Sequence, residues 1–408
     1  MAAESTALID VGALFAAVAL AGLGANRIGQ SVIPFYIVIG MLLGEHVLGQ
    51  IDFPSLLGTE IVPHGSELAL AETDFVHVGA EIGIVLLLFF LGLEFNLDRL
   101  IASKDRIWKA GTVDLAINFG TGLVLGWALF GAFLPAVLTA GIVYISSSAI
   151  ITKSLIDLGW IANDEADAML GTLVFEDLFI AVYLAIVTAL ALGGGNIGDA
   201  LGLIGLSIGF ILALLLLVYS GTAWFQRSLE TDSHEFIVLR ALGITVLVSG
   251  AALTLGVSEA VAAFFVGMAF SATDHVHDLE NLLEPLRDTF AAVFFFWIGL
   301  VTDPTLFPEV VWLIAAAVVL ATPTKLLSGY LGGRIYDLSE RRSVRVALTG
   351  AGAGLETGIA SDIYAFAVGY VLVMSILGTT LMQYADEIES VVVPRLESGP
   401  AAARSGDD

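Results

Sequence analysis

Two adjacent carboxylates, Glu176 and Asp177, lie near the middle of an apolar stretch that runs from Leu170 to Leu192. A carboxylate at the depth of a lipid bilayer is energetically unfavourable, and proteins keep one there mainly where it handles an ion or a proton. Burial favours the protonated form of a carboxylate, whereas an alkali cation prefers oxygen ligands. A buried carboxylate can therefore be a site at which a cation and a proton compete.

The composition of the chain places this pair in a membrane. Hydrophobic residues make up 57% of the 408 residues, charged residues make up 14%, and the mean hydropathy is +0.92. A soluble chain would carry about a quarter charged residues. The sequence contains no cysteine, which excludes disulfides and thiol chemistry. The first apolar run lacks a basic leader and a small-residue cleavage site, so we expect a permanent span rather than a signal peptide.

The net charge of the chain is −25, from 41 acidic against 16 basic residues. This balance argues against nucleic acid and against anionic lipid patches as partners. The acidic residues gather in expected loops such as 162–168 (ANDEADA) and 230–235 (ETDSHE). Such an acidic, lysine-poor surface is typical of halophile proteins, and we expect that origin.

Helices of about 20 apolar residues cross a bilayer, and this measure predicts about thirteen spans. They cover residues 7–25, 32–48, 75–95, 107–130, 134–157, 165–192, 197–220, 235–255, 258–272, 285–301, 309–332, 343–363 and 369–386. If the N-terminus lies outside, every basic residue except Lys325 falls on the cytoplasmic side, as the positive-inside rule requires. We therefore expect a multi-pass protein of the cell membrane whose residues 394–408 form a short acidic cytoplasmic tail.

Lys325 lies inside the eleventh span, nine residues before Arg334, which is about 13 Å along a helix. One interpretation is a lysine that stretches to the interface. We favour the other, an ion pair with Glu176 or Asp177, because a lysine at this depth normally has a partner. Asp114, in the fourth span, either lines an inner funnel or is solvated at the interface.

Two spans are predicted to be interrupted at their centres. The fifth contains Ser146, Ser147 and Ser148 in succession, a poor composition for continuous helix. The twelfth reads LTGAGAGLETGIAS, with Glu356 among its glycines. Spans four to six and eleven to thirteen thus form two triplets with a doubtful middle helix, and they run with opposite topology. Inverted repeats with broken helices are typical of secondary transporters.

Several blocks of the sequence resemble, in order, the monovalent cation:proton antiporter superfamily, and most of all its Kef-type and NapA-type branch. The blocks are LLLFFLGLEFNLDRL (86–100), YISSSAIITKSLIDLG (144–159), VFEDLFIAV (174–182), EAVAAFFVGMAFS (259–271), EPLRDTFAAVFFFWIGL (284–300) and TKLLSGYLGGR (324–334). The resemblance covers nearly the whole chain. It implies an all-α membrane protein that exchanges Na⁺ or K⁺ for H⁺ and needs no cofactor.

The resemblance also implies roles for parts of the chain. It implies a core (about 107–192 and 309–386) that moves against a dimerisation panel (about 7–95 and 235–301), with a linker helix at about 197–220, in a homodimer. Asp177 would carry the cation or the proton, Glu176 would pair with Lys325, and the serines at 146–148 would line the site. Glu356 would neutralise helix dipoles at the second crossover.

A sodium-coupled organic-solute symporter could use the same architecture, as could a K⁺ efflux system that needs a separate cytosolic regulatory subunit. A channel filter or the paired aspartates of an intramembrane protease are not evident in the sequence. We expect an antiporter, with Na⁺ slightly favoured over K⁺.

Overall fold

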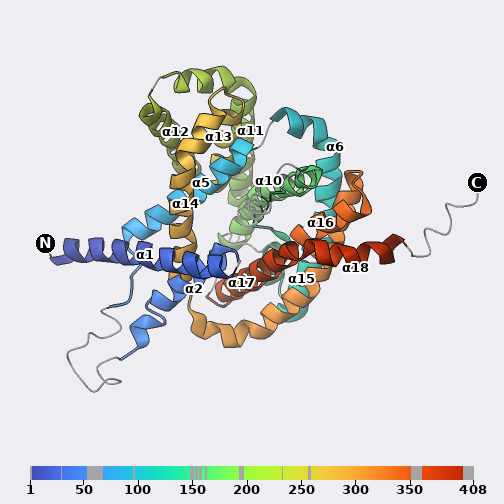
Figure 1. The fold of residues 1–408 in the computed structure, drawn as a ribbon, viewed down its shortest axis with the longest axis horizontal. Helices are drawn as coiled ribbons and strands as arrows, with labels where there is room; N and C mark the ends of the chain where they lie inside the picture. The colour runs from blue at the N-terminus through green and yellow to red at the C-terminus, as the bar shows by residue number, and fades with distance from the viewer. Residues whose placement is uncertain are drawn as a thin grey trace, which may run out of the picture. The chain divides into compact units, whose positions relative to one another are not determined.

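The protein is described by a computed structural model (Figure 1). The structure describes residues 2–28, 30–52, 68–94, 97–147, 151, 155, 159–160, 163–192, 197–231, 233–255, 259–350 and 361–397. Within these ranges the chain forms helices joined by turns and irregular segments, without a strand. The predicted all-α class is confirmed.

Seven helical stretches among the described residues are long and apolar enough to cross a membrane. They are Leu8–Arg27, Val32–Gln50, Asp74–Leu93, Ser103–Phe130, His234–Thr254, Pro304–Ile335 and Ala365–Gln383. Two shorter helices, α8 (Phe133–Tyr144) and α13 (Glu259–Ser271), are also apolar. The chain is therefore a multi-pass membrane protein.

The chain divides into two compact units. The first comprises Met1–Arg99, Ala181–Val311 and Gly358–Val368. Its helices are α1 (Ala2–Arg27), α2 (Val32–Leu43), the short η1 (Leu48–Gln50), α5 (Asp74–Glu94), α11 (Ile197–Leu229), α12 (His234–Thr254), α13, α14 (Val276–Val301) and the short η3 (Pro304–Leu306). Helix α2 packs against α14, and α5 packs against α13 and α14. Glycines such as Gly40 and Gly92 bring these helix backbones close together, as is common in membrane helix pairs.

The second unit comprises Leu100–Ile180, Trp312–Thr357 and Gly369–Asp408. It contains most of α6 (Leu97–Asp114), the π-helical turn η2 (Leu115–Phe119), α7 (Gly120–Phe130), α8, α16 (Glu340–Gly350) and α18 (Ala385–Glu397). Like α6, the helices α10 (Asp164–Leu192), α15 (Phe307–Ile335) and α17 (Ser361–Gln383) contribute residues to both units. All residues discussed below as a site lie in the second unit.

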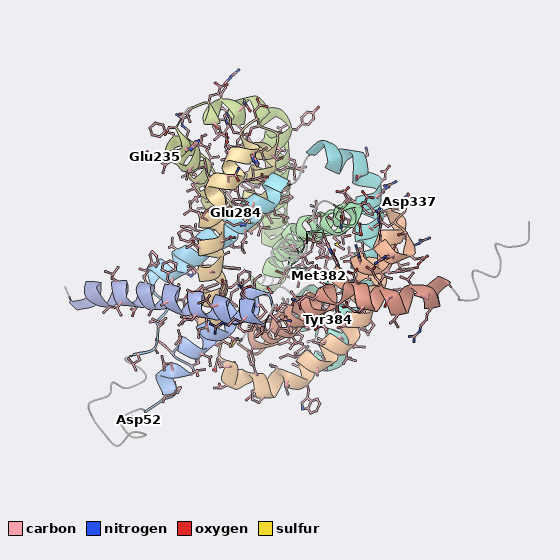
Figure 2. The ribbon with its side chains drawn as sticks, viewed as in Figure 1. Asp52, Glu235, Glu284, Asp337, Met382 and Tyr384 are labelled. Carbon is pink, nitrogen blue, oxygen red and sulfur yellow. The ribbon has the colours of Figure 1, made fainter. Side chains whose placement is uncertain are left out.

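Two tight turns shape the second unit. Helices α15 and α16 are joined at Asp337, whose φ is 60°, and Tyr384 is the turn residue between α17 and α18; both are labelled in Figure 2. The glycines of α15 let α16 pack directly on it. A Cβ on Gly329 would lie 2.8 Å from the Cα of Ala347, and one on Gly333 would lie 2.7 Å from the Cα of Ser343.

Several element bounds differ from the predicted ones. Helix α2 ends at Leu43, where Gly44 caps it, rather than near residue 48. Helices α11 and α14 extend beyond the predicted spans, because a helix does not have to end where its apolar window ends. Helix α17 (Ser361–Gln383) includes residues before 369, where the thirteenth span was predicted to start, and α18 was not predicted from the sequence. The predicted division into core, panel and linker stays a prediction.

Candidate functional site

The predicted interruption of the fifth span is present in the structure. Helix α8 ends at Tyr144, and Ile145 has extended backbone angles (φ −72°, ψ 134°). Ser146 and Ser147 continue outside any helix. The last carbonyls of a helix have no intrahelical partner, so a break at bilayer depth exposes polar backbone groups that must be satisfied by other parts of the protein.

Glu176 satisfies one side of this break. It projects from α10, is buried, and accepts two hydrogen bonds from Ser146. The backbone N–H of Ser146 donates to Oε2 at 2.5 Å, and the Ser146 hydroxyl lies 3.0 Å from Oε1. These two hydrogen bonds hold the non-helical segment against α10, and they satisfy a backbone N–H that the helix break leaves without a helical partner.

Lys325 satisfies the other side. Only 2% of this lysine is exposed, and its ammonium donates to the backbone carbonyl of Tyr144 at 3.0 Å and to the Ser146 hydroxyl at 3.2 Å. The Ser146 hydroxyl therefore lies between the ammonium and the Glu176 carboxylate. The contact between Lys325 and Glu176 is relayed through this serine, instead of being a direct pair within 4 Å.

Asp114 forms a second buried group next to this chain of contacts. Its Oδ1 accepts from the Asn118 amide at 2.8 Å and from the Ser328 hydroxyl at 2.6 Å. The same Asn118 amide nitrogen also donates to the Ser328 hydroxyl at 2.9 Å. Asp114 precedes the π-helical turn η2 and Asn118 lies within it, and π turns inside longer helices are frequent at functional sites.

The charges of the site are unequal in number. Among the described side chains, Asp114 and Glu176 each interact electrostatically with Lys325, so two carboxylates face one ammonium. Asp114 Oδ2 and Asn118 Oδ1 are buried and accept no hydrogen bond from a donor among the described residues. A buried site with this charge balance favours a bound proton or cation.

Aromatic rings pack beside these polar groups. Phe179 of α10 meets Tyr144 edge-on with centroids 5.2 Å apart, and it meets Phe119 in the same manner at 5.5 Å. The rings place apolar surface beside the polar groups, and a less polar environment strengthens the electrostatic interactions within it.

The structure brings together four of the predicted site residues: Ser146, Glu176, Lys325 and Asp114. Ser147 lies next to them in the non-helical segment and is half-buried. Asp177 is part of α10, but its side chain lies outside the described part of the structure, as do Ser148 and Glu356. Asn118, Ser328 and the Tyr144 carbonyl were missed by the sequence analysis.

A helix that breaks inside an apolar unit, with buried charged side chains beside the break, is a feature of secondary transporters. The transmembrane sodium/hydrogen exchanger family matches residues 13–385, and the chain belongs to this family. It is accordingly a transporter and not an enzyme.

Individual relatives agree with this membership. A K⁺/H⁺ antiporter subunit from Bacillus subtilis (strain 168) is 35% identical over 384 residues, which cover 91% of this chain and 91% of the relative. A Na⁺/H⁺–K⁺ antiporter from Bacillus cereus is 27% identical over 89% of this chain and 92% of the relative. A solved structure of a sodium/proton antiporter from Methanocaldococcus jannaschii matches 95% of this chain and 99% of its own with a TM-score of 0.67; at 16% identity, this likeness concerns the fold alone.

Proposed function

We propose that the chain exchanges a monovalent cation for protons by alternating access, with Asp177 as the group that binds either ion. The observation that carries the proposal is the engagement of Glu176 by both the N–H and the hydroxyl of Ser146. Neighbouring helix residues point about 100° apart. Of the two adjacent carboxylates, Glu176 is thus committed to the helix break, and Asp177 is assigned to the ion.

In this proposal Glu176 and Lys325 brace the break. Lys325 neutralises the Tyr144 carbonyl at the C-terminal end of α8, and Glu176 neutralises the N–H of the segment that follows. A cation and a proton then compete for Asp177, with the serines 146–148 as further oxygen ligands. Because one ligand replaces the other, each conformational cycle moves cations one way and protons the other.

The transported cation is proposed to be Na⁺, with K⁺ as the alternative. The names of the two bacterial relatives include both ions, and hydroxyl, carboxylate and carbonyl oxygens can bind either one. We also propose a homodimer with an outside N-terminus and a cytoplasmic C-terminus. A separate cytosolic subunit is in keeping with the word subunit in the name of the Bacillus subtilis relative.

The test is ion flux in proteoliposomes that enclose a pH-sensitive dye, with Na⁺, K⁺ and Li⁺ added in turn to the purified protein. Wild-type protein is expected to dissipate an imposed pH gradient with at least one of these ions. Asp177→Asn is expected to abolish exchange. The matched control is Asp167→Asn, which changes an exposed aspartate of the same helix and should leave exchange intact.

Unchanged exchange in Asp177→Asn would remove the carrier assignment. A symporter instead would require an organic solute for sodium entry and would show no dye response to cations alone.

A further inference from the structure

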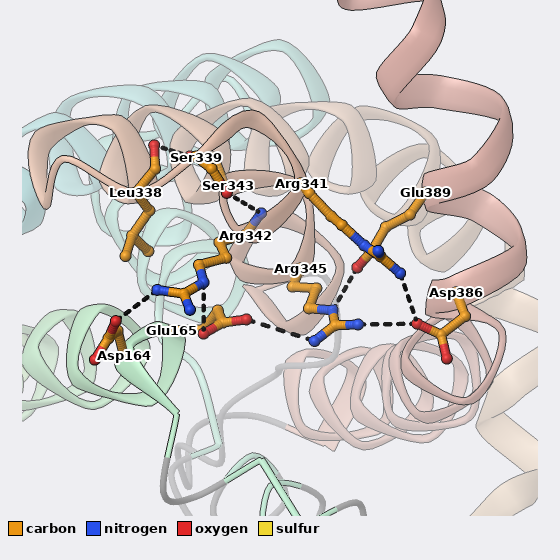
Figure 3. Close-up of polar contacts among 10 residues, drawn as sticks. All are labelled: Asp164, Glu165, Leu338, Ser339, Arg341, Arg342, Ser343, Arg345, Asp386 and Glu389. Carbon is orange, nitrogen blue, oxygen red and sulfur yellow. Dashed lines mark hydrogen bonds and ion pairs between the residues drawn. The ribbon is translucent and has the colours of Figure 1, made fainter.

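A cluster of charged side chains in the second unit lies apart from the ion site. We call it the arginine cluster: Arg341, Arg342 and Arg345 of α16, Asp164 and Glu165 of α10, and Asp386 and Glu389 of α18 (Figure 3). It joins three helices that are far apart in the sequence.

Arg345 is the central member of the arginine cluster. Its guanidinium lies 3.5 Å from Glu165, 2.9 Å from Asp386 and 2.5 Å from Glu389, and its carbon Cζ lies 5.0 Å from the centre of the Trp160 ring. Arg342 adds contacts of 2.5 Å to Asp164 and 3.8 Å to Glu165. Arg341 contacts Glu389 as well.

Two of the carboxylates in the cluster are buried. Glu165 is 3% exposed and Glu389 is 2% exposed, and each contacts two arginines. Solvent-exposed ion pairs contribute little to the stability of a fold, whereas removing the partner of a buried carboxylate is strongly destabilising. The cluster therefore fixes α16 against α10 and α18 more firmly than surface ion pairs would.

Glu165 and Glu176 lie on nearly the same face of α10. They are eleven residues apart, which at about 100° per residue is three turns plus about 20°, a rise of about 16 Å. A shift or rotation of α10 at Glu165 would therefore be transmitted directly to the carboxylate that holds Ser146.

Helix α16 is also bound to the helix that carries Lys325. The close approach at Gly329 and Gly333 leaves no space for a side chain between α15 and α16. Lys325, Gly329 and Gly333 follow at intervals of four residues, along one side of α15. Helices α10 and α15 are thus connected twice, once through Ser146 at the ion site and once through α16.

We propose that Glu165 and Arg345 are positioning residues for exchange: they hold α10 relative to α15 so that Glu176 and Lys325 both reach Ser146. The inference rests on the proposed function, because it concerns the geometry of that site. Arg345 also contacts Glu389 of α18, so α18 contributes to the positioning of the ion site.

The test compares Glu165→Gln, Arg345→Gln and the double variant in the proteoliposome assay, with Glu387→Gln of α18, an exposed carboxylate, as the matched control. The half-saturating cation concentration of each single variant is expected to rise about threefold to thirtyfold. The effects of the two single variants should be less than additive in the double variant, because both remove the contact between Glu165 and Arg345. Glu387→Gln should match wild type.

A purely structural role would lower the yield and melting temperature of the variants but leave the half-saturating concentration and the pH profile of the folded fraction unchanged. That result overturns the proposal. If the glutamine variants do not fold, Arg345→Lys takes their place, because lysine retains the charge but cannot make the forked contact of a guanidinium. This variant is expected to shift the half-saturating concentration. Wild-type affinity in Arg345→Lys would also overturn the proposal. Wild-type protein and Asp177→Asn are measured alongside, so failure of the exchange assignment itself would be visible separately.

Discussion

The ammonium of Lys325 donates a 3.0 Å hydrogen bond to the backbone carbonyl of Tyr144, the last helical residue of α8. A positive charge at the C-terminal end of a helix is favourable, because the terminal carbonyls carry partial negative charge. The helix end therefore provides an acceptor for the buried ammonium of Lys325, and the ammonium provides a donor for the last carbonyl of α8. Each would be unfavourable without the other.

Lys325→Gln is expected to destabilise the protein by about 3–5 kcal/mol, because it leaves the buried carboxyl groups of Asp114 and Glu176 without the nearby ammonium. Exchange should slow or change its voltage dependence. Thermal unfolding and proteoliposome flux measure the two effects. Lys104→Gln, at an exposed lysine, is the control. A variant that melts like wild type would show that Lys325 does not hold the break.

Ser146→Ala is expected to reduce exchange about tenfold, because about 1.4 kcal/mol is lost when the hydroxyl between Lys325 and Glu176 is removed. The backbone N–H of residue 146 remains, so the protein should still fold. The control is Thr172→Val, because the Thr172 hydroxyl of α10 donates to Ala168 of its own helix. Equal flux in the two variants would argue against a relay through Ser146.

The charged members of the site could be predicted from sequence because Glu176, Asp114 and Lys325 are ionisable residues in apolar surroundings. Asn118 and Ser328 could not, since uncharged polar residues are common in helices. Their only signal is spacing, four residues after Asp114 and three after Lys325. The Tyr144 carbonyl is a backbone group and leaves no trace in a residue pattern.

The fold was predictable to a similar degree. Hydropathy identifies helices that cross a bilayer, so it does not detect α18, whose residues 385–397 include five charged side chains. In the sequence, the arginines of α16 indicate only which side of the membrane is cytoplasmic, through the positive-inside rule. Their partners Glu165 and Glu389 lie far away along the chain, and only the folded structure brings them together.

Ser328→Ala is expected to destabilise the protein by about 1–3 kcal/mol, because it removes a donor from the buried carboxylate of Asp114. In an Asp114→Asn background the same change should have a smaller effect, which a double-mutant cycle on the unfolding free energy would measure. Ser375→Ala is the control, because the Ser375 hydroxyl donates to Leu372 of its own helix. Additive effects at 114 and 328 would contradict a functional contact between them.

Gly329→Ala is expected to lower the melting temperature, with a loss of about 1–3 kcal/mol from overpacking. The added methyl group would lie 2.8 Å from the Cα of Ala347, and a backbone atom cannot move aside as a flexible side chain can. Helix α15 would have to separate from α16, which would also draw Lys325 away from Tyr144.

Gly332→Ala is the matched control for this change. A Cβ on Gly332 meets nothing nearer than the Cβ of Ala110 at 4.0 Å, an ordinary contact. This variant should be neutral or gain up to about 1 kcal/mol from the higher helix propensity of alanine. Both variants add one methyl group to the same helix three residues apart, so their difference reports the α15–α16 contact alone. If the two proteins melted at the same temperature, close packing of α16 on α15 would not be what holds Lys325 in register with the helix break.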